Sequence, residues 1–226
     1  ITMPKHKLDY DLSVNHRLKK HKHEEEEVVE AEEEEEHPMM DMLGLSDSVV
    51  VRDNHIYFYC TVTKKNIVRL ITSLRDVSKK LQYIRSDLGA ENLKIYLHIN
   101  SNGGSVFAAL AAIDTIISSP IPIVSIVEGG AASAATLISV VCQERKVTPN
   151  SFMLVHQLSS GFWGKMEEIK DEFINLKKLM RTLTKIYKKH TKIDDSEETT
   201  LKSLLKRDLW LSSKECLKYG MVDVVE

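Results

Sequence analysis

Cysteine is scarce in this 226-residue chain, which has only Cys60, Cys142 and Cys216. An odd number of cysteines without a CxxC spacing argues against a disulfide framework and against a cysteine-based zinc site. Free thiols are often buried, where they behave as small apolar side chains. We therefore expect three reduced cysteines in buried positions, as in an intracellular protein.

Long hydrophobic runs are also missing. The most apolar stretch, Ile121–Cys142, is interrupted by Glu128 and by the pair Gly129-Gly130. This pattern is typical of a strand, a turn and a helix, not of a membrane span. The polar N-terminus lacks the apolar segment of a secretory signal. These absences predict a protein of the cytoplasm, or of an organelle matrix or stroma, that has no membrane partner.

A dense basic surface is not expected either, because basic and acidic residues are nearly balanced in the part of the chain that we expect to fold. Residues 1–23 carry six Lys/Arg against two Asp, 24–37 carry ten Glu and no Lys or Arg, and 38–226 carry 25 basic against 21 acidic residues. This balance argues against nucleic acid as a partner. Blocks of like charge stay solvated, so we expect 1–37 to be a disordered tail and 38–226 to fold. No metal site is expected, since no set of ligands is complete.

What the chain does contain, from residue 49 onward, is an alternation of strand-like and helix-like segments. β-Branched runs and helical spacing of apolar residues carry these assignments. Strands are predicted at Val49–Val51, His55–Val62, Leu93–Ile99, Ile121–Val127 and Phe152–His156, and helices at Lys65–Ile84, Ser105–Ser118, Ala132–Val141 and Lys165–His190. Repeated strand–helix–strand units imply parallel strands joined by right-handed crossovers, so the expected fold class is α/β.

Three junctions after strands carry residue types that can do chemistry, at the edge where α/β folds gather their reactive groups. At Ser101–Ser105, two glycines allow backbone N–H groups to face an anion, although such turns are common. Ser133 follows a glycine pair among small residues, where an N-cap serine is the more usual interpretation. His156 ends a strand, where a lone histidine is more often structural. Together the junctions supply a nucleophile, a base and oxyanion donors.

Four motifs in a fixed order resemble the proteolytic subunit of Clp proteases. They are Asn100–Val106 (NSNGGSV), Glu128–Ser133 (EGGAAS), Pro149–Gln157 (PNSFMLVHQ) and Arg207–Cys216 (RDLWLSSKEC), with Tyr219–Asp223 (YGMVD) after them. The likeness covers residues 49–226 with near-family spacing. Asn102 replaces the family's usual proline, but both glycines of that motif are retained.

The resemblance implies a triad in which Ser133 is the nucleophile, His156 the base and Asp208 the residue that orients the imidazole. It also implies an oxyanion hole formed by the backbone N–H groups of Gly104 and Ala134. The assignment of the acid rests on the resemblance. The residues alone leave other aspartates open, namely Asp171, Asp194, Asp195 and Asp223.

The resemblance further implies a fold of the kind shared by Clp peptidases and crotonases, with a mostly parallel sheet and a protruding helix–strand handle at about 157–190. Family members are serine endopeptidases of ATP-dependent protein degradation. They form stacked heptameric rings around a chamber, into which a partner unfoldase feeds unfolded polypeptides. The partner uses the ATP, so no cofactor is expected in this chain.

Three other functions remain open at this point. The first is a noncatalytic ring subunit of the same fold, although such subunits usually lose triad residues. The second is a crotonase-type acyl-CoA hydratase or isomerase, which uses an oxyanion hole and does not need Ser133. The third is a serine/lysine signal-peptide peptidase, which requires a lysine base and usually a membrane anchor.

Overall fold

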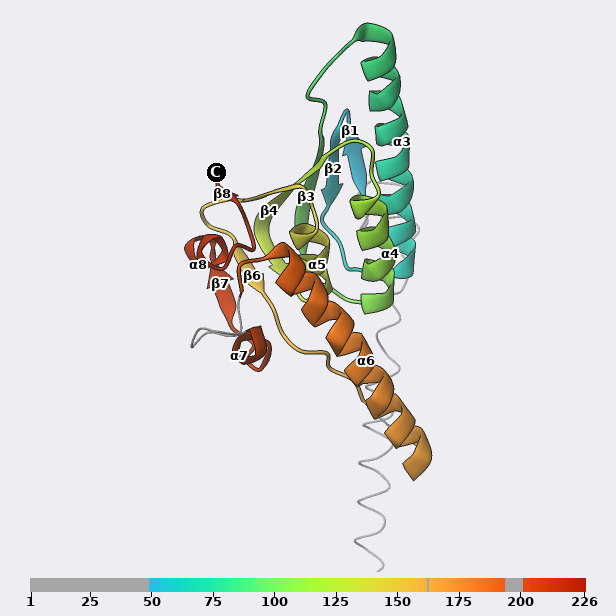
Figure 1. Cartoon of the computed structure of the whole chain (residues 1–226), viewed down its shortest axis with the longest axis vertical. Helices are drawn as coiled ribbons and strands as arrows, with labels where there is room; N and C mark the ends of the chain where they lie inside the picture. Colours follow the sequence, from blue (N-terminus) through green and yellow to red (C-terminus); the bar gives the residue numbers. More distant parts are fainter. Residues whose placement is uncertain (1–48, 162, 194–200) are drawn as a thin grey trace, which may run out of the picture. The chain divides into compact units, whose positions relative to one another are not determined.

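Strands of one open, mostly parallel sheet organise the chain (Figure 1). The computed structural model describes residues 49–161, 163–193 and 201–226, which lie in a compact unit spanning Asp47–Glu226. The predicted tail, 1–37, lies outside the described residues.

The strands are β1 (Val50–Arg52), β2 (His55–Phe58), β3 (Ile95–Ser101), β4 (Ile123–Ala132), β5 (Glu144–Val147), β6 (Phe152–Leu154), β7 (Trp210–Ser212) and β8 (Val224–Val225). The helices are α3 (Lys64–Leu88), α4 (Val106–Ile117), α5 (Ala134–Val140), α6 (Met166–His190), α7 (Leu201–Leu205) and α8 (Ser213–Lys218).

The main path of the sheet runs β1-β2-β3-β4-β5-β8, and β6 pairs with both β4 and β7. Only β1–β2 and β6–β7 are antiparallel among the described pairs. The other pairs are parallel. This topology confirms the predicted α/β class and its mostly parallel sheet.

One face of the sheet carries the core, because side chains alternate along β2 and β3. Ile56, Phe58, Leu97 and Ile99 are fully buried and belong to the core cluster, into which α3, α4 and α5 also bury side chains. The opposite face carries polar and aromatic side chains, among which His98 is hydrogen-bonded to His55 (2.8 Å) and to Glu128 (3.0 Å). At β2 and β3 the helices therefore cover one face of the sheet, while the other carries these polar and aromatic side chains.

Helix α3 is longer than predicted, and its ends explain why. Thr63 caps the N-terminus, where its hydroxyl accepts a bond from the Asn66 N–H. At the other end, Gly89 adopts the left-handed conformation with φ +62°, which ends the helix without strain. The helix therefore continues past Ile84, where the predicted segment stops.

The glycine pair after Ile121–Val127 is part of a strand, and the turn predicted at Glu128–Gly130 is wrong. Strand β4 runs through these residues to Ala132. Gly129 has φ +77°, which glycine tolerates, and its N–H donates to the Ser151 hydroxyl. The register with β3 shifts at this point, so the glycines make an irregularity within the strand and do not reverse the chain.

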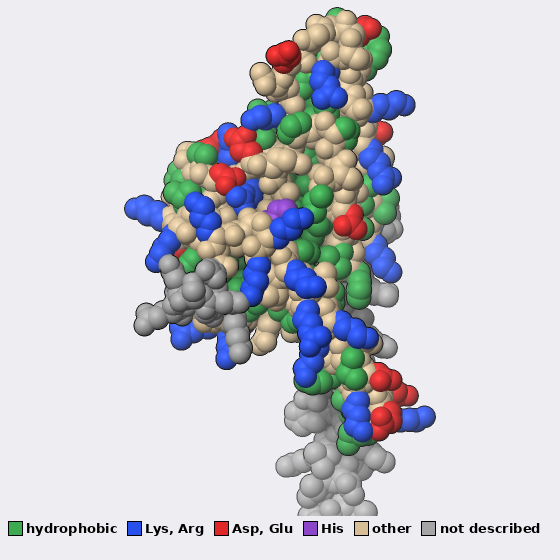
Figure 2. Space-filling model, in the orientation of Figure 1, with side chains coloured by type: hydrophobic (Ala, Val, Ile, Leu, Met, Phe, Trp, Pro, Cys, Tyr) green, Lys and Arg blue, Asp and Glu red, His purple; other side chains and the backbone are tan. Residues whose placement is uncertain are grey.

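Helix α6 is the predicted helix of the handle, and most of it is exposed. It extends beyond the sheet (Figure 1), and its buried residues are Leu183 and Tyr187, near its C-terminal end. Apolar residues recur along it at alternating spacings of three and four: Met166, Ile169, Phe173, Leu176, Met180, Leu183 and Tyr187. Lys and Arg side chains gather on the surface over this helix (Figure 2). The described residues between β6 and α6 form no strand.

All three cysteines are buried, as predicted, and none of them forms a disulfide bond. Burial raises the pKa of the Cys142 and Cys216 thiols to about 12, so both stay protonated. None of the described helices combines the length and the apolarity that a membrane crossing requires.

Candidate active site

The antiparallel pairing of β6 with β7 brings His156 and Asp208 together. Leu154 lies opposite Trp210 in this ladder. His156 comes two residues after Leu154 and Asp208 two residues before Trp210, so a continued register places them opposite each other. The His156 Nδ1 and Asp208 Oδ1 atoms are 3.9 Å apart, which is ion-pair range but longer than a hydrogen bond. The Asp208 side chain is 83% exposed and that of His156 25%.

The parallel pairing of β4 with β6 brings Ser133 to the same edge of the sheet. Ala132 lies opposite Leu154, and the Ser133 N–H donates a 2.8 Å bond to the Leu154 carbonyl. Ser133 and His156 thus follow the carboxyl ends of adjacent parallel strands, where reactive groups were expected. Within the described part of the chain, the Ser133 hydroxyl and the His156 ring are not hydrogen-bonded to each other. Catalytic hydrogen bonds often tighten only when substrate binds.

Ser133 has an unusual backbone conformation, with φ +54° and ψ −123°. Few residues with a side chain adopt positive φ, and strain of this kind is typical of functional positions. Ser133 stands at the N-cap of α5, yet its side chain makes no capping hydrogen bond, so its hydroxyl is left for other chemistry. A strand, a strained serine and a helix form the same kind of turn as a nucleophile elbow, although the GxSxG sequence is absent.

The glycine loop after β3 packs directly against this turn. Gly103 has φ +93°, and a Cβ atom there would lie 2.6 Å from the Ala132 carbonyl oxygen and 2.8 Å from the Ser133 Cβ. Only glycine permits such an approach. The loop is held from its other side, because the Val62 N–H donates to the Gly103 carbonyl at 2.8 Å.

The two predicted oxyanion donors have no acceptor within the described residues. Val62 bonds to the residues on either side of Gly104, so the Gly104 N–H is not used in this bridge. Ala134 is the first residue of α5, where the helix offers its N–H no acceptor. Ala134 directly follows Ser133, and Gly104 directly follows the Gly103 that packs against Ser133, so both N–H groups are available for the predicted role as oxyanion donors.

The structure separates Asp208 from the other aspartates that the sequence leaves open. Arg145 donates to Asp223 from Nε (3.0 Å) and Nη2 (2.5 Å), and it also donates to the His190 and Gly220 carbonyls. Burial alone would raise the pKa of Asp223, but these bonds and the charge of Arg145 hold that pKa below its ordinary value. Asp223 thus serves as a structural partner.

Of the remaining candidates, Asp171 lies on the exposed part of α6, while Asp194 and Asp195 lie outside the described residues. Among the described carboxylates, that of Asp208 is the one within ion-pair distance of His156.

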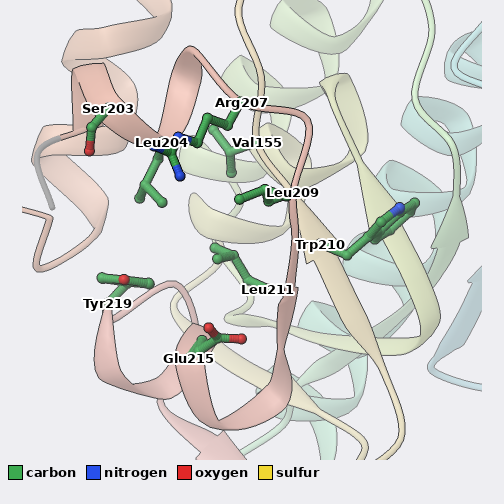
Figure 3. Close-up of a pocket in the computed structure, with 9 residues that line it drawn as sticks. All are labelled: Val155, Ser203, Leu204, Arg207, Leu209, Trp210, Leu211, Glu215 and Tyr219. Atoms are coloured by element: carbon green, nitrogen blue, oxygen red, sulfur yellow. The ribbon is translucent and has the colours of Figure 1, made fainter.

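A cavity of about 410 Å³ lies beside β7 (Figure 3). Its lining comprises Val155, Ser203, Leu204, Arg207, Leu209, Trp210, Leu211, Glu215 and Tyr219. Leu209 and Leu211 point into the space, whereas Trp210 points to the other side of the strand (Figure 3). The lining contains neighbours of His156 and Asp208 but neither residue itself, so this cavity lies next to the candidate site and does not contain it.

Two hydroxyl side chains behind Ser133 carry no signal in the sequence that would single them out. Thr136 donates a 2.6 Å bond from its Oγ1 to the Ser133 carbonyl, and Tyr187 of α6 is hydrogen-bonded to the same Thr136 Oγ1 at 2.6 Å. Tyr187 fits an ordinary apolar helix pattern, and its contact with Thr136 joins residues 51 positions apart.

Comparison with known proteins decides the family. Residues 48–226 match the family model described as Clp protease. The chain belongs to the Clp protease family. A relative from Deinococcus radiodurans, named ATP-dependent Clp protease proteolytic subunit, is 36% identical over 134 residues, which cover 58% of this chain and 64% of that protein. A relative of the same name from Streptococcus mutans is 34% identical over 175 residues, or 74% of this chain and 87% of that protein.

Family membership confirms the predicted class of protein, a Clp-type protease and thus a serine endopeptidase. The crotonase and serine/lysine alternatives find no support in these comparisons.

The close approach of Gly103 to Ser133 predicts that this glycine cannot be replaced. Gly103→Ala should lower the rate of fluorophosphonate labelling at Ser133 by about 10²-fold or more, because the new Cβ displaces the turn and misplacements of about 1 Å cost this much. The rate is measured by intact mass against time. Gly161→Ala is the control, since a Cβ there meets nothing within 4 Å. Equal labelling rates in the two variants would contradict the prediction.

Proposed function

We propose that this Clp-family protease cleaves peptide bonds with Ser133 as nucleophile, His156 as general base and Asp208 as the residue that orients the imidazole. The observation that carries the proposal is the arrangement around β6, whose two neighbours deliver Ser133 and Asp208 to the edge at which His156 leaves the sheet. The uncapped hydroxyl of Ser133 supports the same role.

In this mechanism the Ser133 oxygen attacks the carbonyl carbon of the scissile bond while His156 takes the hydroxyl proton. The N–H groups of Gly104 and Ala134 bind the oxyanion of the tetrahedral intermediate, and one such donor contributes roughly 3 kcal/mol of transition-state stabilisation. The imidazolium then protonates the leaving amine. Water, activated by the same imidazole, hydrolyses the acyl-enzyme and restores Ser133.

Asp208 acts on His156 and not on the substrate. A carboxylate beside Nδ1 keeps the proton on that nitrogen, which leaves Nε2 free to accept the serine proton, and it stabilises the imidazolium. The 3.9 Å separation means that a shift of about 1 Å brings the pair into hydrogen-bond range. As a largely exposed loop residue, Asp208 can make such a shift at low cost.

We also propose that the chain assembles with itself into stacked heptameric rings, to which an ATP-dependent unfoldase supplies unfolded polypeptides. The exposed apolar stripe of α6 supports an interface, since its spacing of three and four residues is that of helices that pack side by side. Met166 and Phe173, at 69% and 54% exposure, would be covered there. The unfoldase uses the ATP in this proposal, and the chain itself requires no cofactor.

The proposed compartment is the cytoplasm or an organelle matrix or stroma. Three buried cysteines that form no disulfide bond fit a reducing environment.

The proposed nucleophile predicts a single reactive serine. Incubation with a fluorophosphonate should add one adduct per chain, and Ser133→Ala should abolish it, because the reagent reacts only with an activated hydroxyl. Intact-mass analysis measures the adduct, and native mass shows the assembly. Absence of an adduct from protein that forms rings would instead favour a noncatalytic ring subunit.

The proposed orienter predicts a large loss of turnover in Asp208→Asn. The amide cannot hold the correct tautomer, so kcat on an unstructured peptide should fall by roughly 10⁴-fold, as in other Ser-His-Asp triads. The matched control is Asp171→Asn, which makes the same change on exposed α6 and should leave kcat unchanged. Near-normal kcat in Asp208→Asn would show that a different carboxylate serves His156.

The proposed ring interface predicts that Phe173→Asp halves the native mass, because a charge in the apolar stripe prevents two rings from stacking. Asn175→Asp is the control: it adds the same charge to another face of α6 and should leave the native mass unchanged. An unaltered mass for Phe173→Asp would remove α6 from the interface.

A further inference from the structure

Tyr187, Thr136 and the Ser133 carbonyl form a hydrogen-bonded chain beneath the candidate active site. The Tyr187 Oη and Thr136 Oγ1 atoms are 2.6 Å apart, and Thr136 Oγ1 lies 2.6 Å from the Ser133 carbonyl oxygen. Both side chains are buried, with Tyr187 3% exposed and Thr136 fully enclosed. These hydrogen bonds link α6, a helix that projects from the domain, to the residue proposed as nucleophile.

The direction of these bonds follows from the number of protons. The Thr136 hydroxyl has one proton, and the carbonyl of Ser133 can only accept, so this proton is donated to Ser133. Tyr187 must therefore donate to Thr136 Oγ1. Burial raises the pKa of Tyr187, which keeps its hydroxyl protonated at any pH at which the protein would work.

The acceptor carbonyl belongs to the peptide group that joins Ser133 to Ala134. The N–H of that peptide group is one of the two proposed oxyanion donors. A peptide group is planar, so fixing the direction of its carbonyl also fixes the opposite direction of its N–H. A bond accepted by the carbonyl also polarises the N–H, because hydrogen bonds in a chain reinforce one another. The strained φ of Ser133 makes such support necessary, since the unaided backbone would relax.

We propose that Tyr187 and Thr136 are positioning residues for the reaction at Ser133, forming a relay from α6 that holds the Ser133–Ala134 peptide group in the orientation that aims its N–H at the oxyanion. The proposal rests on the proposed function of Ser133 as nucleophile. It assigns to Tyr187 a role beyond packing, because the relay depends on the phenol hydroxyl and not on the ring.

A second buried hydroxyl pair provides a matched comparison. Ser125 and Ser139 are fully buried, and their Oγ atoms are 3.1 Å apart. Ser139 lies on α5, as Thr136 does, but this pair contacts β4 and not the Ser133–Ala134 peptide group. Ser139→Ala therefore removes a buried hydrogen bond from the same helix without touching the relay.

The test compares Tyr187→Phe, Thr136→Val, their double variant, Thr136→Ser and Ser139→Ala by fluorophosphonate inactivation, resolved into a maximal rate and a half-saturating concentration. Tyr187→Phe should lower the maximal rate by about tenfold and leave the half-saturating concentration within about twofold, because the relay acts on the transition state. Thr136→Val should lose at least as much, and the double variant no more than Thr136→Val. Thr136→Ser should retain the wild-type rate.

The control variant separates a positioning role from a merely structural one. If the relay positions the peptide group, Ser139→Ala should lower the thermal midpoint about as much as Tyr187→Phe does but should leave the maximal rate of inactivation unchanged. The relay would be overturned if the maximal rate of Tyr187→Phe equalled that of the wild type, or if Tyr187→Phe and Ser139→Ala lost the same fraction of that rate. Labelling of Ser133 in the wild type would still support its role as nucleophile in either case. Additive losses in the double variant would show that the two hydroxyls act separately.

Absence of labelling in wild-type rings would instead reject Ser133 as the nucleophile. The relay is then tested by the rate of amide hydrogen exchange. Amides of residues 133–139 should exchange faster in Tyr187→Phe than in Ser139→Ala. Equal exchange in the two variants would reject the relay as a support for this turn.

Discussion

The register of the ladder β4–β6–β7 is the constraint on which the candidate site depends. Its two pairings fix where the chain leaves the sheet, and each of the three proposed triad residues lies within two positions of a paired residue. Side chains in a ladder alternate between faces, so a slip of one residue would send His156 or Asp208 to the opposite side. The glycines of β4 support this register, since Gly129 bonds to Ser151 just before β6 begins.

The strain at Ser133 is offset by hydrogen bonds made at the turn itself. A residue in such a backbone conformation costs of order 1–3 kcal/mol. Its peptide groups accept bonds from the Thr136 N–H and hydroxyl and donate one to Leu154, at about 0.5–1.5 kcal/mol each. The cost and the gain are of the same size, and one of these bonds, that of the Thr136 hydroxyl, is itself supported by Tyr187 of α6. Gly103 packs against this turn, and it fits there because it carries a hydrogen atom where other residues carry a Cβ.

Much of this arrangement is predictable from sequence, where local pattern and local structure agree. Apolar spacing places α3, α4 and α6 to within a few residues, and the small residues around Ser133 indicate a close approach. The partners of His156 are a different matter. Its contact with Asp208 depends on antiparallel pairing between segments far apart in the chain, which no local pattern encodes, and only the family resemblance selected Asp208. The turn predicted at Gly129 and Gly130 is wrong because Gly130 pairs with Phe152 of β6, and no local pattern encodes that pairing.

Because β6 pairs with β7, the distance between His156 and Asp208 does not depend on the length of the segment that connects them. His156 and Asp208 are held by the strands beside them, whereas the chain that connects them makes a long excursion through α6 and α7. Insertions and deletions in this connection leave the distance between His156 and Asp208 unchanged as long as the two short strands still pair. The projecting helix can therefore change in length, charge or shape while the positions of His156 and Asp208 at the edge of the sheet are kept.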